Sequence, residues 1–294
     1  MIGIDWGTTS FRAFRMNPDG TIRDRAVSAN GIMNVLNSRF AETLREEIGP
    51  WLAAGEDHVL ISGMIGSRQG WAEVPYLPCP ATPADIAAAV LEAGFDWGQV
   101  LLVPGLSGTD ESGIAEVMRG EETQIAGIPA LLDSGGVACL PGTHSKWARI
   151  ENGQIVQFTT HMTGEIFAAL RGHTILGRMM RDGPAVDEAF DRGVARSDDP
   201  GGLLHHAFGV RAETLANRLP ETESASYLSG ILIGHEVRSA LGSSAPGTVH
   251  LIGTPDLTRL YARAIATLGG GSELHGDEAA AQGLALIGRF APWR

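Results

Sequence analysis

The feature that most constrains the fold is a strand–turn–strand pattern that occurs twice. Residues 2–14 form an apolar strand containing Asp5, a turn with Gly7, Thr8 and Thr9, and a second strand with alternating apolar positions. Glycine lets a backbone approach a ligand closely, and successive N–H groups in such a turn form a concavity that binds anions. A carboxylate at the strand end beside this turn predicts a site for metal-bound phosphate.

The second copy lies at residues 137–160, where a strand is followed by a turn with Gly142 and Thr143, a further strand, a glycine turn and a third strand. Hairpins with glycine turns are common, but two three-stranded units with Gly-Thr in the first turn indicate an internal duplication. We therefore expect an α/β fold with one domain at 1–130 and a second at 131–294.

Strands alternate with helices in both halves. Strands are expected at 1–6, 10–16, 21–28, 58–62, 99–103, 136–141, 145–150, 154–160 and 248–252. Helices are expected at about 40–52, from 82, at 120–128, 163–180 and 224–241, after 254 and from about 277. The helix at 82 has the clearest start signal, because Thr82 is followed by a proline and then by Asp85. The polar stretch 181–221 carries no such pattern.

Composition excludes several classes of function. The net charge of −12 and the lack of a basic run argue against nucleic-acid binding, which needs clustered Lys and Arg. Cys79 and Cys139 lie far apart without metal-ligand spacing, which favours a reducing compartment over a disulfide framework. There is no signal segment and no apolar run of about 20 residues, so we expect a cytoplasmic protein without a membrane partner. The composition is compatible with a homo-oligomer.

Several nucleotide- and metal-binding motifs are absent. The chain has neither G-x-x-x-x-G-K-[ST] nor G-x-G-x-x-G after a strand, which removes the main support for P-loop and Rossmann folds. It also lacks H-E-x-x-H and clustered Cys and His, so we expect no dedicated zinc site. His205 and His206 are expected to be solvated and not catalytic.

Two further features could carry chemistry, and each has a plainer explanation. Lys146 is the only lysine of the chain and follows the second turn. A compact ammonium there could contact phosphate, or Lys146 could be an exposed strand residue. Glu121 and Glu122 stand at a predicted helix start, where acids favour the helix dipole, but one of them could also act as a base.

These motifs resemble those of ATP-dependent sugar kinases in the actin-like and hexokinase-like superfamily. Asp5–Thr9 looks like the first phosphate motif, Gly142–Thr143 like the second and Leu251–Thr254 like the adenosine motif. In more detail, the chain is similar to the 2-dehydro-3-deoxygalactonokinase family. The segments that carry this resemblance follow one another over most of the chain: Ile4–Gly7, Gly63–Ser67, Pro75–Leu77, Val103–Leu106, Met118–Gln124, Pro141–Trp147, Met162–Glu165 and Ser229–Gly234.

The resemblance implies an α/β fold of two ribonuclease-H-like (actin-like ATPase) domains with mixed sheets flanked by helices, and an active site in the interdomain cleft. It implies an enzyme of galactonate breakdown that uses ATP and Mg²⁺. The γ-phosphoryl group would pass to the terminal (6-) hydroxyl of 2-dehydro-3-deoxy-D-galactonate. In related kinases the base is an Asp after a glycine, just before the second phosphate motif. This chain has Glu121 and Glu122 at that place.

By this resemblance, Asp5 would hold Mg²⁺, and Glu121 or Glu122 would accept the proton of the sugar hydroxyl. Contacts with ATP and its phosphates are expected from Gly7, Thr8, Thr9, Arg12, Gly142, Thr143, Lys146, Gly253 and Thr254. Contacts with the sugar acid are expected from Trp6, Arg68, Arg119 and Glu165, with Arg68 or Arg119 as the cation for its carboxylate.

Two alternatives stay open at this point. The substrate could be the epimeric 2-dehydro-3-deoxygluconate or a related sugar acid, because no residue pattern distinguishes one hydroxyl configuration. The chain could also be an actin-like ATPase or nucleotide sensor without kinase activity. Its compact length and acidic composition disfavour that alternative.

Overall fold

The computed structural model describes residues 1–17, 19–242, 247–276 and 278–294. The chain divides into two compact units. The first unit comprises residues 1–135, 148–158 and 276–294, and the second comprises 136–147 and 159–275. The predicted boundary near residue 130 assigned 276–294 to the second domain, whereas this segment packs in the first unit.

A six-stranded mixed sheet forms the centre of the first unit, in the order β3-β2-β1-β4-β7-β6. Its strands are β1 (Ile2–Trp6), β2 (Phe11–Met16), β3 (Ile22–Ser28), β4 (His58–Gly63), β6 (Leu91–Ala93) and β7 (Gln99–Leu102). β1 pairs antiparallel with β2 and parallel with β4. The predicted strands in this region are confirmed to within one residue at each end, whereas β6 was not predicted.

The other elements of the first unit surround this sheet. The helices are α1 (Phe40–Ala53), α2 (Pro83–Ala88), α3 (Glu121–Ala126), α4 (Pro129–Ser134) and α10 (Glu278–Phe290), with 3₁₀ turns η1 (Ile32–Asn34), η2 (Leu36–Ser38) and η3 (Met64–Gly66). A small sheet has the order β5-β8-β9, from β5 (Leu77–Pro78), β8 (Leu106–Thr109) and β9 (Ala115–Met118). The predicted start of α2 is confirmed, since Thr82 and Asp85 form a reciprocal capping box.

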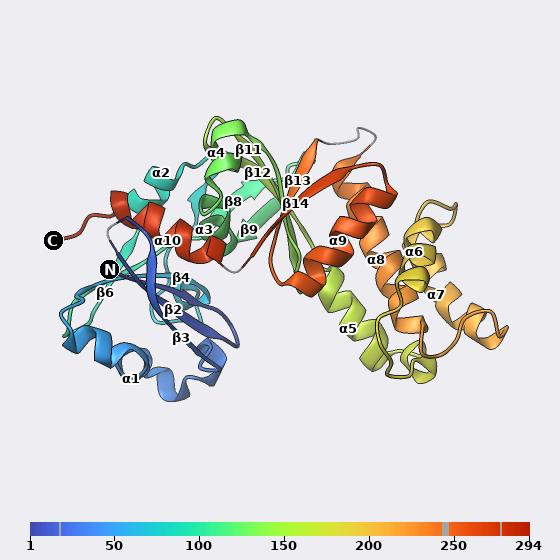
Figure 1. The fold of residues 1–294 in the computed structure, drawn as a ribbon, viewed down its shortest axis with the longest axis horizontal. Coiled ribbons are helices and arrows are strands. Elements are labelled where there is room, and N and C mark those ends of the chain that lie inside the picture. The colour runs from blue at the N-terminus through green and yellow to red at the C-terminus, as the bar shows by residue number, and fades with distance from the viewer. Residues whose placement is uncertain (18, 243–246, 277) are drawn as a thin grey trace. The chain divides into compact units, whose positions relative to one another are not determined.

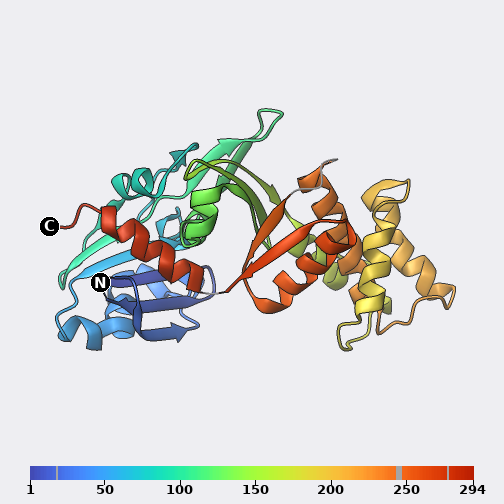
Figure 2. The same ribbon diagram turned by 45° about the horizontal axis from the view of Figure 1, so that its top comes forward.

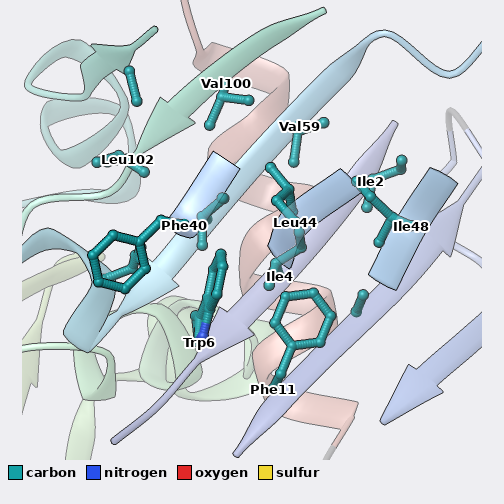
Figure 3. Close-up of a cluster of buried hydrophobic side chains, with 14 of the residues drawn as sticks. Ile2, Ile4, Trp6, Phe11, Phe40, Leu44, Ile48, Val59, Val100 and Leu102 are labelled. Carbon is teal, nitrogen blue, oxygen red and sulfur yellow. The ribbon is translucent and has the colours of Figure 1, made fainter. Parts of the chain in front are cut away.

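Helices from opposite ends of the chain cover the two faces of the large sheet (Figures 1 and 2). Ile2, Ile4 and Trp6 alternate along β1 and pack in one hydrophobic cluster with α1 (Figure 3). On the other face lies α10. A Cβ at Gly3 would lie 3.0 Å from Cβ of Leu284, so the glycine lets α10 approach the sheet closely.

The same helix α10 also holds α3. A Cβ at Gly283 of α10 would lie 1.7 Å from the carbonyl oxygen of Thr123. At the other end of α3, a Cβ at Gly127 would lie 1.9 Å from the carbonyl oxygen of Ala279. Because no residue larger than glycine fits at these positions, the backbones of the two helices are in direct contact. This contact fixes the position of α3 against α10.

The second unit is built on a sheet of order β12-β11-β10-β13-β14. Its strands are β10 (Gly136–Leu140), β11 (Ser145–Glu151), β12 (Gln154–His161), β13 (Thr248–Ile252) and β14 (Gly271–His275), and the boundary between the units falls within β11 and β12. β10, β13 and β14 run parallel to one another. The four predicted strands are confirmed, whereas the edge strand β14 was not predicted.

Helices make up the rest of the second unit. They are α5 (Thr163–His173), the 3₁₀ turn η4 (Gly177–Met179), α6 (Asp187–Arg196), α7 (Gly202–Leu215), α8 (Ser224–Leu241) and α9 (Pro255–Thr267). The unassigned stretch 181–221 therefore contains α6 and α7, which pack beside α8 (Figure 1). Glycine again brings helices together, since a Cβ at Gly230 of α8 would lie 2.0 Å from the carbonyl oxygen of Phe190 in α6.

The helix predicted at 163–180 is too long, because α5 ends at His173 and the chain then turns through η4. The predicted start of the last helix, residue 277, lies outside the described residues. Among the residues that the structure describes, no helix is long and apolar enough to cross a membrane.

Candidate active site

Asp5 lies near the end of the central strand β1, opposite Arg12 on β2 and Ser62 on β4. Its carboxylate is almost fully buried and accepts a hydrogen bond of 2.5 Å from the guanidinium of Arg12. A Cβ at Gly63, the last residue of β4, would lie 3.2 Å from Oδ1 of Asp5. The glycine therefore leaves space beside one carboxylate oxygen while Arg12 holds the other.

The first Gly-Thr turn joins β1 to β2 as expected. The amide of Gly7 donates to the carbonyl of Ser10 at 2.9 Å, which leaves Thr8 and Thr9 exposed at the tip. The turn is supported from behind by Gly31, where a Cβ would lie 2.4 Å from the backbone nitrogen of Thr9. The exposed hydroxyls and the rigid backing are suited to contact with a phosphate.

Trp6, a predicted substrate contact, belongs to the core. Its ring is fully buried, lies edge-on to Phe11 and Phe40, and donates from Nε1 to the carbonyl of Asn30 at 2.8 Å (Figure 3). A ring without exposed surface anchors the strand that carries Asp5, and it offers no face to a substrate in this structure.

Glu121 and Glu122 begin α3 close to Asp5 within the first unit. They follow Gly120, whose added Cβ would lie 3.3 Å from Cα of Gly63, the same glycine that borders Asp5. The positive φ of Gly120, 107°, turns the chain into the helix at this contact. The strand end, Gly63 and the helix start therefore form one group of neighbours.

The two glutamates differ in environment. Glu122 is fully buried, and its two carboxyl oxygens accept from the Gly120 amide at 2.7 and 3.0 Å. Burial, and then the neighbouring Glu121, raise the pKa of Glu122 to about 8. Glu121 is only partly buried and accepts from the Arg119 amide at 2.9 Å. Glu122 therefore holds the helix start, and Glu121 is the more accessible acid.

The two arginines proposed for the sugar carboxylate also differ. Arg68 is exposed and already paired with Glu73 at 2.9 Å. The guanidinium of Arg119 lies over the ring of Tyr76, 4.4 Å from its centre, and donates from Nη2 to the Val74 carbonyl at 2.8 Å. Among the described residues, its Nε and Nη1 are buried without a hydrogen-bond partner. Unsatisfied buried donors are costly, so Arg119 is suited to receive an anionic ligand.

The second Gly-Thr turn lies in the second unit, between β10 and β11. Thr143 is exposed, and the turn packs against the start of α5, where a Cβ at Gly164 would lie 2.4 Å from the Gly142 carbonyl oxygen. The Glu165 amide donates to the Thr143 carbonyl at 3.1 Å. The Glu165 carboxylate lies 2.6 Å from Nε2 of His144. Each Gly-Thr turn is thus backed by a glycine from another segment of its own unit.

A buried hydrogen-bond chain holds this turn from below. The Gly142 amide donates to Oγ of Ser145 at 3.5 Å, and Ser145 lies 2.9 Å from the hydroxyl of Tyr261. Tyr261 donates to Glu236 at 2.6 Å, and Trp147 donates to the other oxygen of Glu236 at 2.8 Å. Since the single proton of Tyr261 goes to Glu236, Ser145 must donate to Tyr261 and so can accept from Gly142.

Lys146 follows Ser145 and is buried, so it is not the exposed strand residue that one interpretation allowed. Gly253 and Thr254 follow β13, beside the second turn. A Cβ at Gly253 would lie 3.7 Å from the carbonyl oxygen of Pro141, because β10 and β13 are paired in parallel. Thr254 is exposed and occupies the N-cap position of α9, where its side chain makes no capping hydrogen bond.

A cavity of about 300 Å³ opens next to the second turn, wholly within the second unit. Gly142 and Gly164 line it at the turn. Its walls are mostly apolar and come from helices and from the segment before α6: Phe167, Gly183, Pro184, Ala185, Val186, Phe190, Ala225, Ser226, Ser229, Leu232, Ile233, Leu257, Leu260 and Tyr261. Three charged residues, Arg171, Arg181 and Asp187, also line it. A mostly apolar pocket that ends at a Gly-Thr turn is suited to a nucleotide base and its phosphates.

Sequence reasoning missed these walls. Only the Ser229–Gly234 and Met162–Glu165 segments were noted, and for neither was a place in a nucleotide pocket expected. Gly183–Asp187 falls in the stretch that carried no pattern, and its one sequence signal is the small-residue run Gly183–Ala185.

Two α/β units, each with a Gly-Thr turn backed by a glycine, are the features expected of the fold of actin-like ATPases and sugar kinases. The fold agrees with this, since component A of the Acidaminococcus fermentans (R)-2-hydroxyglutaryl-CoA dehydratase matches with a TM-score of 0.53 at 12% identity, over 99% of this chain and 96% of its own. Within this class the chain belongs to the 2-keto-3-deoxy-galactonokinase family, whose model matches residues 5–287.

Individual relatives agree with this assignment. The Rhizobium meliloti protein named "Probable 2-dehydro-3-deoxygalactonokinase DgoK1" is 35% identical over 97% of this chain and 95% of its own. The Escherichia coli 2-dehydro-3-deoxygalactonokinase is 33% identical over 91% and 90%. A crystal structure from Sinorhizobium meliloti, provisionally described as a 2-dehydro-3-deoxygalactonokinase, has a TM-score of 0.88 at 33% identity, over 98% of both chains. The chain is a sugar kinase, and a kinase of this family implies ATP as the phosphoryl donor.

Proposed function

We propose that the chain transfers the γ-phosphoryl group of ATP to the terminal (6-) hydroxyl of 2-dehydro-3-deoxy-D-galactonate. The products are 2-dehydro-3-deoxy-6-phospho-D-galactonate and ADP. The observation that carries the nucleotide part is the apolar cavity ending at Gly142 of the second Gly-Thr turn. The substrate rests on the names of the relatives in Rhizobium meliloti and Escherichia coli. We expect the enzyme to work in the cytoplasm, either as a monomer or as a homo-oligomer.

Within the second unit we assign the nucleotide. The base would lie in the cavity between α8 and α9, and Gly253 and Thr254, which precede α9, are assigned to the adenosine. The phosphates would contact the amides and hydroxyl of Gly142 and Thr143, a turn that is already fixed by Gly164 and by the Ser145 chain. Lys146 would contribute positive charge near this turn.

Within the first unit we assign Asp5 as the residue that holds Mg²⁺. Carboxylate oxygens are the ligands Mg²⁺ prefers, and Gly63 leaves space beside Oδ1, so the residues present fit the ion. Bound there, Mg²⁺ would neutralise charge on the phosphates. Thr8, Thr9 and Gly7 would contact phosphate at the exposed turn, and Arg12 keeps the carboxylate in place.

The acceptor also belongs to the first unit in this proposal. The sugar hydroxyl oxygen attacks the γ-phosphorus, its proton passes to a carboxylate, and ADP leaves. Glu121 is favoured over Glu122 as that base because Glu122 is fully buried and bonded to its own helix start. Phosphoryl transfer depends mainly on positioning and charge, so a strong base is not needed.

Arg119 is assigned to the carboxylate of the sugar acid. Its unpaired donors and its stacking on Tyr76 present a fixed guanidinium, the geometry that binds carboxylates best. Arg68 has a partner in Glu73, and Glu165 is engaged by His144 in the second unit, so both are weaker candidates. Trp6 is assigned a supporting role behind Asp5.

A coupled assay of ADP release, run with a panel of sugar acids, tests the function. We expect the highest kcat/KM with 2-dehydro-3-deoxy-D-galactonate and lower values with 2-dehydro-3-deoxygluconate and other acids. A higher kcat/KM with the gluconate epimer would change the assigned substrate, but the assignment as a kinase would stand. ADP release that no acceptor stimulates would favour an actin-like ATPase or sensor. Asp5→Asn should abolish stimulated turnover without unfolding the protein.

A further inference from the structure

Three side chains on the edge of the second unit's sheet converge without any role in the proposed phosphoryl transfer. His250 lies on β13, and Glu273 and His275 lie on the edge strand β14. The register pairs His250 with Glu273 and Ile252 with His275. Since residues two apart on a strand share a face, all three side chains project from the same side of the sheet. This group was not expected from the sequence, because Glu273 and His275 are 23 and 25 residues from His250 and β14 was not predicted.

The ligand atoms lie close enough for a shared ion. Nδ1 of His250 lies 2.9 Å from Nε2 of His275. One Glu273 oxygen lies 3.9 Å from Nδ1 of His250, and the other lies 3.8 Å from Nε2 of His275. Two ligands of one tetrahedral Zn²⁺, each bound at about 2.0–2.1 Å, lie about 3.3 Å apart. Small adjustments would bring the three side chains to this geometry, and Glu273 can move because its side chain is 57% exposed.

We propose that His250, Glu273 and His275 form a binding site for a divalent transition-metal ion of the Zn²⁺ type. Two imidazole nitrogens and a carboxylate are ligands typical of zinc, whereas Mg²⁺ and Ca²⁺ prefer oxygen alone. Three protein ligands leave a fourth position for water. The ion would join β13 to the edge strand β14, next to the point where the Gly253 amide donates to the His275 carbonyl at 3.3 Å.

A second pair of histidines in the second unit has a similar separation but no carboxylate as a third ligand. His206 and His235, from α7 and α8, also place Nδ1 and Nε2 2.9 Å apart. The other nitrogen of His206 lies 3.3 Å from the carbonyl oxygen of Pro200. His206 is fully buried, so the expectation that it is solvated was wrong. In the described part of the chain, His250, Glu273 and His275 are the only group of three or more His, Cys, Asp or Glu side chains close enough to share a metal ion. The His206 pair lacks a third ligand and is best explained as a hydrogen bond.

Metal binding to the full chain, freed of metal by a chelator and kept without nucleotide, tests the proposal. We expect one equivalent of Zn²⁺ to bind by calorimetry, and Co²⁺ to give visible absorption bands of a site with nitrogen ligands. Glu273→Gln and His275→Gln should each weaken Zn²⁺ binding by at least about 10–100-fold, as much as loss of a residue that only supports a ligand. His235→Gln, which alters the other histidine pair, should leave binding unchanged.

Glu273 is exposed, so Glu273→Gln should keep the fold, as the melting temperature would show. Zn²⁺ should raise the melting temperature of the metal-free chain, and this rise should vanish in Glu273→Gln and His275→Gln. The proposal would be overturned if the unaltered chain did not bind Zn²⁺. It would also be overturned if both variants bound Zn²⁺ with the affinity of the unaltered chain. Either result would identify the group as a histidine hydrogen bond beside a surface carboxylate. Neither result bears on the kinase, because nucleotide and sugar acid are absent from the test.

Discussion

At the residue scale, the adjacent acids Glu121 and Glu122 are the two candidates for the base that accepts the proton of the sugar hydroxyl. The partly buried Glu121 can reach a ligand, whereas the buried Glu122 holds the start of α3. We expect Glu121→Gln to lower kcat by about 10²–10⁴-fold, the usual contribution of a general base, with ATP binding unchanged. Glu122→Gln, at the buried acid that holds the start of α3, should change kcat much less. Steady-state kinetics and ATP calorimetry on both variants identify the base. A larger loss of kcat in Glu122→Gln than in Glu121→Gln would assign the base to Glu122.

The raised pKa of Glu122 has a consequence for stability. The folded protein keeps this proton up to about pH 8, whereas the unfolded chain loses it near 4.5. Between these values the folded state binds more protons, so its stability should fall as pH rises, by at most about 1.4 kcal/mol per pH unit. Glu122→Gln cannot titrate and should lack this part of the slope. Urea unfolding of both proteins between about pH 5 and 8 measures the difference, and parallel profiles would contradict it.

Arg119 is the residue expected to recognise the acid group of the substrate. Arg119→Lys cannot reproduce the planar fork or the stacking on Tyr76, so we expect the KM for the sugar acid to rise about 10–100-fold. The KM for ATP should not change. Arg68→Lys, at the exposed arginine, is the matched control and should leave both constants unaltered. If Arg119→Lys only lowered the melting temperature, Arg119 would be structural.

At the element scale, helix α5 supports the second Gly-Thr turn through one glycine. Gly164→Ala would place a Cβ 2.4 Å from the Gly142 carbonyl oxygen, so the turn must shift. We expect kcat/KM for ATP to fall at least about tenfold, with about 1–3 kcal/mol lost in stability from the overpacking. Gly172→Ala in the same helix meets nothing within 4 Å and should be neutral or stabilising by up to about 1 kcal/mol. Equal behaviour of the two variants would show that the turn tolerates the shift.

The elements also show what could be predicted from the sequence. The strands around the Gly-Thr turns were predictable because alternating apolar residues and glycine turns are local signals in the sequence. The helix α6 was not, because its buried face is completed by Gly230 of α8, far along the chain. The edge strand β14 lacked a signal since most of its residues are exposed. Likewise, the pair Glu121 and Glu122 could not be separated, because burial depends on how α3 packs against Gly63 and α10.

At the scale of the whole molecule, the first unit depends on a helix from the far end of the chain. The sequence assigned residues 276–294 to the second domain, but α10 packs on β1 and α3 of the first unit. A chain ending at His275 should therefore lose cooperative unfolding of the first unit while still binding ATP in the cavity of the second. Near-ultraviolet circular dichroism and ATP calorimetry would show this. Loss of ATP binding with an intact first unit would favour the sequence-based division.

The contact between Gly3 and Leu284 joins the beginning of the chain to its end, and this affects how the protein is made. While the ribosome adds the roughly 140 residues between 135 and 278, the first sheet has no helix on one face. At about 5–20 residues per second this lasts about 7–30 s. The nascent chain must keep an apolar surface from aggregating for that time. The part of the protein that is synthesised first is therefore among the last to be completed.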